Sequence, residues 1–272
     1  MDHGLLHGIL NPLKLLVQKP AYRTLFFLKA RYSNAQRRKE SIIRCFGYTL
    51  RVPDLPSFVY QFKDIFVEEY YRFECDNALP TIIDCGANIG TSCLYYKMRF
   101  PNTRIIAIEA DPSIAGILKE NLEKNSISDV TIVNKAAWIH NDGVEFSPDG
   151  ADGGSIFGST NKVHIPSVRL RDIILDAGHV DFLKVDIEGA EVDVIADCAE
   201  CLVRVDRLYI EYHSWKGQTQ RLDKLLSTLT TSGFTYYVQS IFEHATPLRY
   251  QEIILDNDMQ LHIFAVRNKN PQ

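Results

Sequence analysis

An alternation of short apolar strands and helices begins at residue 81, and it limits the fold more than any other feature of the sequence. Apolar runs predict strands at 81–85, 104–109, 130–135, 181–186 and 207–212. Helices are expected between most of them, and strands joined through a helix normally pair in parallel. Two late strands, at 234–239 and 261–266, predict an antiparallel end to the sheet. The sequence therefore predicts a doubly wound α/β fold.

The stretch 136–169 interrupts this alternation. Asn141-Asp142-Gly143 is typical of a hairpin turn, so we expect residues 138–139 to pair with residues 144–146. The glycines within 149–155 predict a flexible loop. Together with Trp138 and His164, this loop is either a mobile lid over the active site or an ordinary surface loop.

The first 75 residues differ in character from the rest. Prolines divide a segment that otherwise predicts helices, so we expect a helical N-terminal extension or cap at 1–75 and a second domain at 76–272. The first 50 residues hold nine Lys or Arg and only two Asp or Glu, although the whole chain has a net charge of −4. The amphipathic stretch from Leu5 to Val17, flanked by Lys19, could contact a membrane surface peripherally, but packing on the body or on a partner is the simpler interpretation.

Cysteine usage and charge narrow the class of protein further. The six cysteines are scattered through apolar stretches, which predicts buried, reduced thiols in a cytoplasmic protein. Cys198 and Cys201 form a lone CxxC without partner ligands at zinc spacing, so no metal is expected there. No apolar run is long enough to span a membrane, and no signal-peptide pattern is present. The acidic charge beyond residue 50 argues against a nucleic-acid partner.

The strongest functional signal is the strand-to-helix turn at 83–90, which reads Ile-Asp-Cys-Gly-Ala-Asn-Ile-Gly. Glycines there let a ligand approach the backbone, and Glu109 at the end of the next strand is placed to accept both hydroxyls of a ribose. A dinucleotide site would read GxGxxG and present its glycines to a pyrophosphate. Asp84 would repel a phosphate but suits an ammonium or sulfonium group, which favours S-adenosylmethionine over NAD.

Three blocks together resemble the FkbM-type S-adenosylmethionine-dependent methyltransferases: 84–90, 108–112 and 183–191, the last reading Leu-Lys-Val-Asp-Ile-Glu-Gly-Ala-Glu. The resemblance covers about residues 57–240. It implies the seven-stranded class I methyltransferase form of the doubly wound, Rossmann-like sheet. It also implies O-methylation of a hydroxyl on a small molecule, such as a sugar or a natural-product intermediate. The cofactor residues that it implies are Asp84, Gly86, Ala87, Asn88 and Gly90 at the methionine end, Glu109 at the ribose, and Ala110, Asp111 and Ala136 near the adenine.

Four side chains are candidates for the chemistry. Asp186 closes the fourth strand, Glu188 lies in the next turn, and Glu211 and His213 close the fifth strand. Reactions on open α/β sheets take place beyond the carboxyl ends of the strands, where these groups should meet. Asp186, Glu211 or His213 could be the base that takes the acceptor's proton, although Asp186 could instead only cap the following helix. The same three could bind a divalent ion, but no metal is favoured. Lys184 shares a strand face with Asp186 and is expected to pair with it.

Three other functions compete with this one. A nicotinamide-dependent oxidoreductase would need a phosphate-binding turn, which Asp84 disfavours. A non-catalytic nucleoside-binding module on the same fold would not need both Asp84 and Glu109. A nucleic-acid amino-group methyltransferase would carry an Asn/Asp-Pro-Pro-Tyr block, whereas this chain reads Val-Asp-Ile-Glu after the fourth strand.

Overall fold

The computed structural model describes residues 19–32, 35–148, 150, 153–157, 161–215, 217–241 and 257–268. Its backbone divides into two compact units, Met1–Arg72 and Phe73–Gln272. The amphipathic stretch from Leu5 to Val17 lies outside the described residues. Among those described, no helix is long and apolar enough to cross a membrane.

The first unit is not wholly helical, so that prediction is wrong in part. After α2 (Pro20–Tyr32), β1 (Ser41–Cys45) and β2 (Tyr48–Val52) form an antiparallel hairpin, followed by α3 (Leu55–Phe62) and a π-helical turn (Lys63–Val67). Phe46 and Gly47 connect the two strands with φ angles of 49° and 82°. Positive φ at both positions is the geometry of a two-residue hairpin, and the glycine provides it without strain. In the sequence, Gly47 lies within an alternating apolar pattern, and this combination is the signal that indicates the hairpin.

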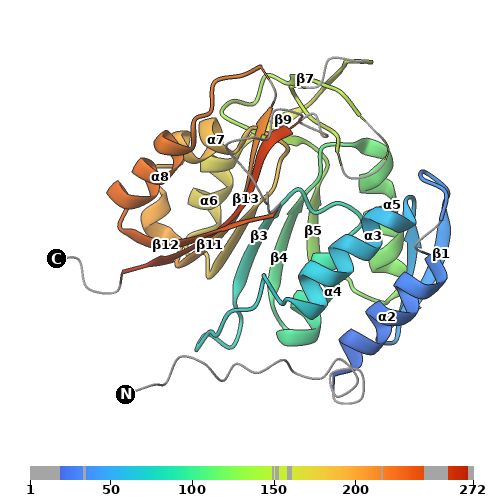
Figure 1. Ribbon diagram of the computed structural model, residues 1–272. Coiled ribbons are helices and arrows are strands. Elements are labelled where there is room, and N and C mark those ends of the chain that lie inside the picture. Colours follow the sequence, from blue (N-terminus) through green and yellow to red (C-terminus); the bar gives the residue numbers. More distant parts are fainter. Residues whose placement is uncertain are drawn as a thin grey trace, which may run out of the picture. The chain divides into compact units, whose positions relative to one another are not determined.

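The second unit is built around the predicted seven-stranded sheet, which is confirmed with the order β12-β13-β11-β10-β3-β4-β5 (Figure 1). β3 to β5, β10 and β11 run parallel, and β13 pairs antiparallel with both β11 and β12. The antiparallel end is therefore also confirmed. The strands span β3 (Thr81–Cys85), β4 (Arg104–Ile108), β5 (Val130–Val133), β10 (Phe182–Val185), β11 (Arg207–Trp215), β12 (Phe234–Ser240) and β13 (Asn257–Arg267).

Helices cover the two faces of this sheet. The apolar sides of α6 (Leu170–Ala177), α7 (Glu191–Asp197) and α8 (Leu222–Thr231) pack with Leu183 and Ile210 of the central strands in one buried core. These three helices gather on one side in Figure 1. Because side chains alternate along a strand, Lys184, Glu211 and His213 lie on the opposite face. α4 (Thr91–Arg99) follows β3 on that face, and α5 (Pro112–Lys124) follows β4.

The predicted hairpin at Asn141–Gly143 is wrong. β6 (Ala136–Trp138) pairs in parallel with β9 (Ser167–Arg169), and β7 (Val144–Phe146) pairs antiparallel with β8 (Val163–Ile165). The hydroxyl of Ser167 donates to the His140 carbonyl and accepts from Gly143 N–H, at 2.7 and 3.0 Å. These long-range bonds occupy the backbone groups at the turn, so its local preference does not decide which strands pair.

Candidate active site

The turn from 86 to 90 is a tight segment between β3 and α4. Gly86 and Gly90 have φ angles of 82° and 87°, and Asn88 also has a positive φ of 48°. A Cβ added at Gly86 would lie 1.9 Å from the backbone oxygen of Asp186, and one at Gly90 would lie 2.6 Å from Leu118 Cδ1. The close backbone of Asp186 thus requires glycine at position 86, and the positive φ favours glycine at position 90. The ligand approach predicted from the sequence is not needed to explain them.

The backbone N–H groups of this turn are already hydrogen-bonded within the chain. Those of Gly86 and Ala87 donate to the Ile108 carbonyl at 2.9 and 3.0 Å. Asn88 N–H donates to Glu109, Ile89 N–H to the Asn88 side chain, and Gly90 N–H to the Ala87 carbonyl. A pyrophosphate site presents such N–H groups to the ligand. This turn therefore lacks the free donors that a dinucleotide would need.

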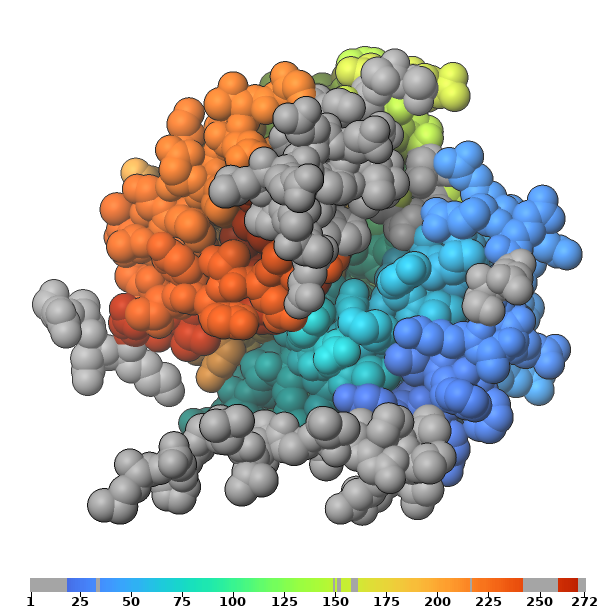
Figure 2. Space-filling view, viewed as in Figure 1, coloured from blue at the N-terminus to red at the C-terminus, as the bar shows by residue number. Residues whose placement is uncertain are grey.

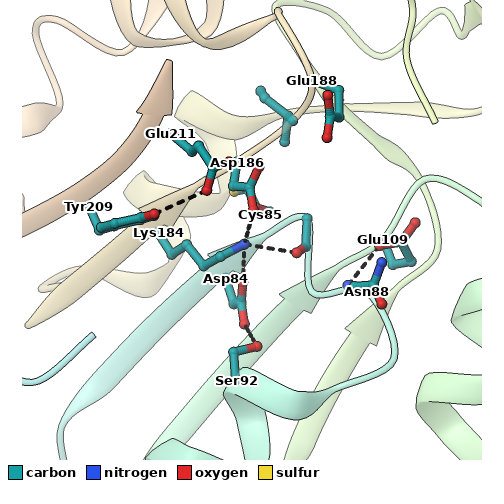
Figure 3. A network of polar contacts seen from close by, with 12 residues as sticks. Asp84, Cys85, Asn88, Ser92, Glu109, Lys184, Asp186, Glu188, Tyr209 and Glu211 are labelled. Atoms are coloured by element: carbon teal, nitrogen blue, oxygen red, sulfur yellow. Dashed lines mark hydrogen bonds and ion pairs between the residues drawn. The ribbon is translucent and has the colours of Figure 1, made fainter. Parts of the chain in front are cut away.

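Glu109 links the turn to the segment after β4. Its Oε2 accepts Asn88 N–H at 2.8 Å (Figure 3). Its Oε1 accepts Asp111 N–H at 2.9 Å. Burial raises its pKa to about 7, against the lowering effect of these two hydrogen bonds. Each carboxylate oxygen keeps a second lone pair, so the group can still accept hydroxyls from a ligand.

The residues predicted near an adenine surround this position. Asp111 caps α5, because its Oδ1 accepts from Ser113 N–H at 2.8 Å and from Ile114 N–H. Ala110 packs against the small apolar cluster formed by Ala136, Phe146 and Ile165. The Asn134 side chain donates to the Glu109 carbonyl at 2.8 Å. Glu109, Ala110 and Ala136 are therefore close together, whereas the Asp111 carboxylate is occupied as a helix cap.

A buried row of charges joins the turn to the predicted catalytic residues. Lys184 Nζ lies 3.4 Å from Asp84 Oδ1 and 3.2 Å from Asp186 Oδ2, and it donates to the Gly86 carbonyl at 2.9 Å. Figure 3 shows this ammonium group between the two carboxylates. The predicted pairing of Lys184 with Asp186 is confirmed. Asp84, which also accepts from the Ser92 hydroxyl, is fully buried and already has a cationic partner.

A second cluster of polar side chains forms on β11, because side chains alternate between the two faces of a strand. Tyr209, Glu211 and His213 share one face, and the register with β13 places His262 opposite Glu211 and Gln260 opposite His213. The Tyr209 hydroxyl donates to Glu211 Oε2 at 3.1 Å, and the Gln260 amide donates to Glu211 Oε1 at 2.5 Å. Glu211 is thereby fixed by neighbours within the sheet.

His213 is enclosed by acidic groups. Its Nδ1 lies 3.1 Å from Glu191 Oε1, and its Nε2 lies 3.5 Å from Glu211 Oε1 and 3.6 Å from Glu188 Oε2. Glu191 Oε1 also accepts Ile187 and Gly189 N–H at 3.2 and 3.0 Å. Glu191 is completely buried, and it fixes both the imidazole and the turn that carries Glu188.

The ionisation of the four candidates follows from this arrangement. Burial raises the pKa of Asp186 to about 6, with Lys184 opposing the shift. Burial and the neighbouring carboxylates raise the pKa of Glu188 to about 8, against the opposing charge of His213. Burial would raise the pKa of Glu211, but hydrogen bonding to His213 and the positive charges of His213 and His262 outweigh it and hold the value at about 2. Burial lowers the pKa of His213, but Glu188 and Glu191 outweigh it, so the pKa lies well above its usual range.

The structure thus brings the four predicted catalytic residues together and places Asp186 beside the glycine turn. Asp186, Glu211 and His213 have donor atoms within 4.8 Å of one another, so they could also hold a metal ion. Part of the predicted lid reaches this group, because Ser155 Oγ donates to the Glu188 carbonyl at 2.6 Å. Of the predicted loop 149–155, the structure describes residues 150 and 153–155, and Asp152 lies outside them.

Sequence reasoning missed four members of the site: Glu191, Tyr209, Gln260 and His262. Glu191 lies at the end of the family block, where its position in the sequence predicts no more than a role in shaping the turn. The spacing Gln260-Leu-His262 mirrors Glu211-Tyr-His213, and this repeated polar alternation in two strands was the only sequence signal. It becomes informative once the two strands are known to pair.

The chain belongs to the FkbM methyltransferase family, because the model for the "Methyltransferase FkbM domain" matches residues 84–236. The match begins at Asp84 and includes the glycine turn, Glu109 and the groups on β10 and β11. It confirms the predicted family.

Two curated relatives and one solved structure are similar to the chain. Methyltransferase sdnD of Sordaria araneosa is 27% identical over 49% of this chain, and 2-O-methyltransferase NoeI of Sinorhizobium fredii is 28% identical over 49% of it. The chain spans 66% and 63% of their lengths. A solved SAM-dependent methyltransferase from Agrobacterium tumefaciens is 10% identical, with a TM-score of 0.53 over 88% of this chain and 73% of that one. At this identity the structural likeness concerns the fold alone.

Proposed function

We propose that this chain is an S-adenosylmethionine-dependent O-methyltransferase that acts on a hydroxyl of a small molecule, such as a sugar or a natural-product intermediate. The observation that carries the proposal is the position of Asp186. Its carboxylate follows β10 directly, its backbone oxygen lies under Gly86, and Glu211 and His213 of the adjacent strand lie beside it. The name of the relative NoeI, a 2-O-methyltransferase, supports oxygen as the acceptor atom.

The residues present fit the proposed cofactor. Glu109 offers a buried carboxylate with free lone pairs at the end of β4, which suits the two hydroxyls of a ribose. Ala110 and Ala136 provide small apolar surface beside it. Asp84 is paired with Lys184, so we assign it to holding the turn in place and not to direct contact with the methionine end. S-adenosylmethionine, when bound, supplies an electrophilic methyl group.

We assign the proton-accepting role to Asp186. A hydroxyl must lose its proton as it is methylated, and a positioned carboxylate can accept it. Asp186 keeps 25% of its side-chain surface exposed, and a pKa of about 6 leaves it mostly ionised at neutral pH. Lys184 opposes the effect of burial on that pKa and fixes one carboxylate oxygen, Oδ2.

Glu211 and His213 are better suited to positioning than to accepting the proton. The two oxygens of Glu211 are engaged by Tyr209 and Gln260, and its pKa of about 2 makes it a weak base. Both nitrogens of His213 face partners within the chain, and its raised pKa keeps the imidazole protonated at neutral pH. Burial and the neighbouring carboxylates raise the pKa of Glu188, and its carboxyl group can hydrogen-bond to the acceptor.

The hydrogen bonding of the 86–90 turn argues against the oxidoreductase alternative. The N–H groups of residues 86–90 are hydrogen-bonded within the chain, so they are not available to a pyrophosphate. This reason replaces the argument from the charge of Asp84, which Lys184 neutralises.

The experiment pairs ligand binding with a transfer assay. Calorimetry should show binding of S-adenosylmethionine and S-adenosylhomocysteine, and tight NAD binding without either would contradict the proposal. A screen of sugars and glycolipid intermediates with labelled S-adenosylmethionine should then yield a product whose methyl group NMR places on oxygen. Activity that is lost with EDTA and restored by Mg²⁺ would recast Asp186, Glu211 and His213 as metal ligands.

A further inference from the structure

The outward face of α2 carries aromatic residues that the active site does not explain. Phe26 and Phe27 are 54% and 62% exposed, whereas Leu25 and Leu28 on the inward side of the same helix are buried. The two phenyl rings contact each other edge to face, with centroids 5.9 Å apart. Adjacent large aromatic side chains that are exposed in this way mark a surface that contacts another protein or a membrane.

The charged side chains of α2 on this face are all basic. Arg23 lies one turn before the two phenylalanines, at i−3 and i−4, and Lys29 and Arg31 occupy the last turn. Together with Lys19, these side chains are exposed, and residues 19–32 contain no Asp or Glu. The excess extends beyond the helix, because the first 50 residues carry nine basic and two acidic side chains.

We propose that α2 attaches the protein peripherally to an anionic lipid surface, with Phe26 and Phe27 inserted at the level of the headgroups. Aromatic rings in a helix with a basic rim are the pattern of an interfacial helix that lies in the plane of the membrane. Arg and Lys can keep their charged ends at the phosphates while their stems lie along apolar surface. Part of α2, in blue, lies at the surface in the view of Figure 2. The surface formed by Arg23, Phe26, Phe27, Lys29 and Arg31 is called the α2 face below.

Charge decides between a membrane and a protein as the occupant. If two copies of this chain paired through their α2 faces, like charges would meet and their repulsion would oppose the pairing. An anionic bilayer attracts each basic residue near its surface, and such attraction weakens as salt shortens the Debye length. Binding through the α2 face should therefore require both the phenylalanines and the charge.

The test is co-sedimentation of the full chain with vesicles of phosphatidylcholine alone or with roughly one third phosphatidylglycerol. Binding is expected only with the anionic vesicles, and it should be lost in about 1 M NaCl. Phe26→Ser with Phe27→Ser should weaken binding at least tenfold, and Lys29→Glu with Arg31→Glu should abolish it. Tyr60→Ser is the matched control, because Tyr60 is 69% exposed but lies on α3, and it should bind like the unmodified chain.

Two further measurements separate a loss of membrane binding from a loss of folding or a change in oligomeric state. Thermal melting shows whether each variant is folded, because residues on an exposed face should hardly change stability. Light scattering reports the oligomeric state. Equal sedimentation with neutral and anionic vesicles, or unchanged binding by the phenylalanine variant, would overturn the proposal. So would an oligomer that the phenylalanine variant converts to a monomer, since the α2 face would then join two copies of the chain.

Discussion

Lys184 Nζ lies 3.2 Å from the Oδ2 of Asp186, and the lysine side chain is only 3% exposed. The same nitrogen lies 3.4 Å from the fully buried Asp84, so one cation serves two carboxylates on neighbouring strands. A buried charge without a partner is costly, and the lysine offsets that cost for both carboxylates. The pairing therefore couples the stability of the sheet to the ionisation of the proposed base.

Replacement of the shared cation should destabilise the protein and weaken its proposed base. Lys184→Met leaves the buried Asp84 and the partly exposed Asp186 without their shared cation, and loss of one partner of a buried pair typically costs about 3–5 kcal/mol. Chemical unfolding should show this loss, whereas the exposed Lys224→Met should stay within about 0.5 kcal/mol of the original protein.

A double-mutant cycle tests whether the loss comes from the charges. Asp84→Asn removes one of the two carboxylates, so Asp84→Asn with Lys184→Met should be more stable than the sum of the single effects predicts. Coupling of about 0.5–3 kcal/mol is usual for residues in contact. Strict additivity would show that Lys184 acts through packing alone.

The pH dependence of turnover should identify Asp186 as the base. Its raised pKa of about 6 means that the ionised form is gained as pH rises, so kcat/KM should increase up to about pH 6 and then level off. Asp186→Asn keeps the shape but removes the proton acceptor. It should lower kcat by roughly 10²–10⁴ and abolish the acid limb of the profile.

Binding and folding separate this role from a structural one. Asp186→Asn should bind S-adenosylhomocysteine with nearly unchanged affinity and stay folded, because Asp84 remains as a partner for Lys184. Asp176→Asn, an exposed substitution of the same type on α6, should leave turnover intact. Near-normal turnover of Asp186→Asn would make the residue a structural group and the assignment wrong.

Local patterns in the sequence were sufficient for most of the sheet and for the positions of Asp186, Glu188, Glu211 and His213. Parallel strands end at one edge, so residues that close adjacent strands meet whatever the details of packing. The register of β11 against β13, by contrast, could not be predicted from local patterns in the sequence. It joins residues about 50 positions apart, and only packing of the whole sheet places Gln260 and His262 beside Glu211 and His213.

A wrong prediction and an incomplete argument have the same physical origin. The Asn141–Gly143 turn favours a hairpin locally, but its neighbours β6 and β7 pair with strands beyond residue 160. The charge of Asp84 was interpreted from its position in the motif, without the lysine that reaches it from β10. In both cases a contact distant in sequence outweighed a local preference.

Cofactor affinity should depend on pH through Glu109. Its pKa is raised to about 7 by burial, and the ionised carboxylate is the better acceptor for ribose hydroxyls. Affinity for S-adenosylhomocysteine should therefore rise as pH increases toward about 7 and level off above it. Calorimetry between pH 6 and 8, about one unit on either side of that pKa, would measure this.

Replacement of the carboxylate tests the same contact. Glu109→Gln has no charge to gain, so its affinity should be nearly independent of pH and roughly ten- to a hundredfold weaker near neutrality. The exposed Glu123→Gln on α5 should retain the original pH dependence. A pH-dependent affinity that survives in Glu109→Gln would assign the titration to another group.

Glu191 should act on turnover through His213 without touching the substrate. It is fully buried, its Oε1 lies 3.1 Å from His213 Nδ1, and the same oxygen accepts two N–H groups of the turn that carries Glu188. Glu191→Gln keeps an oxygen for one of these contacts but removes the charge that raises the pKa of His213. The imidazole should then lose its proton at a lower pH.

The consequence should appear in kcat and in the alkaline part of its pH profile. With His213 neutral, Glu188 and Glu211 lose a nearby positive charge, so the arrangement around Asp186 changes as pH rises. We expect kcat to fall at least tenfold in Glu191→Gln with little change in cofactor affinity, and the fall should deepen with increasing pH. Glu200→Gln, whose side chain is 79% exposed, is the control. A uniform loss of kcat at all pH values, matched by a lower melting temperature, would mean that Glu191 only supports the fold of the turn.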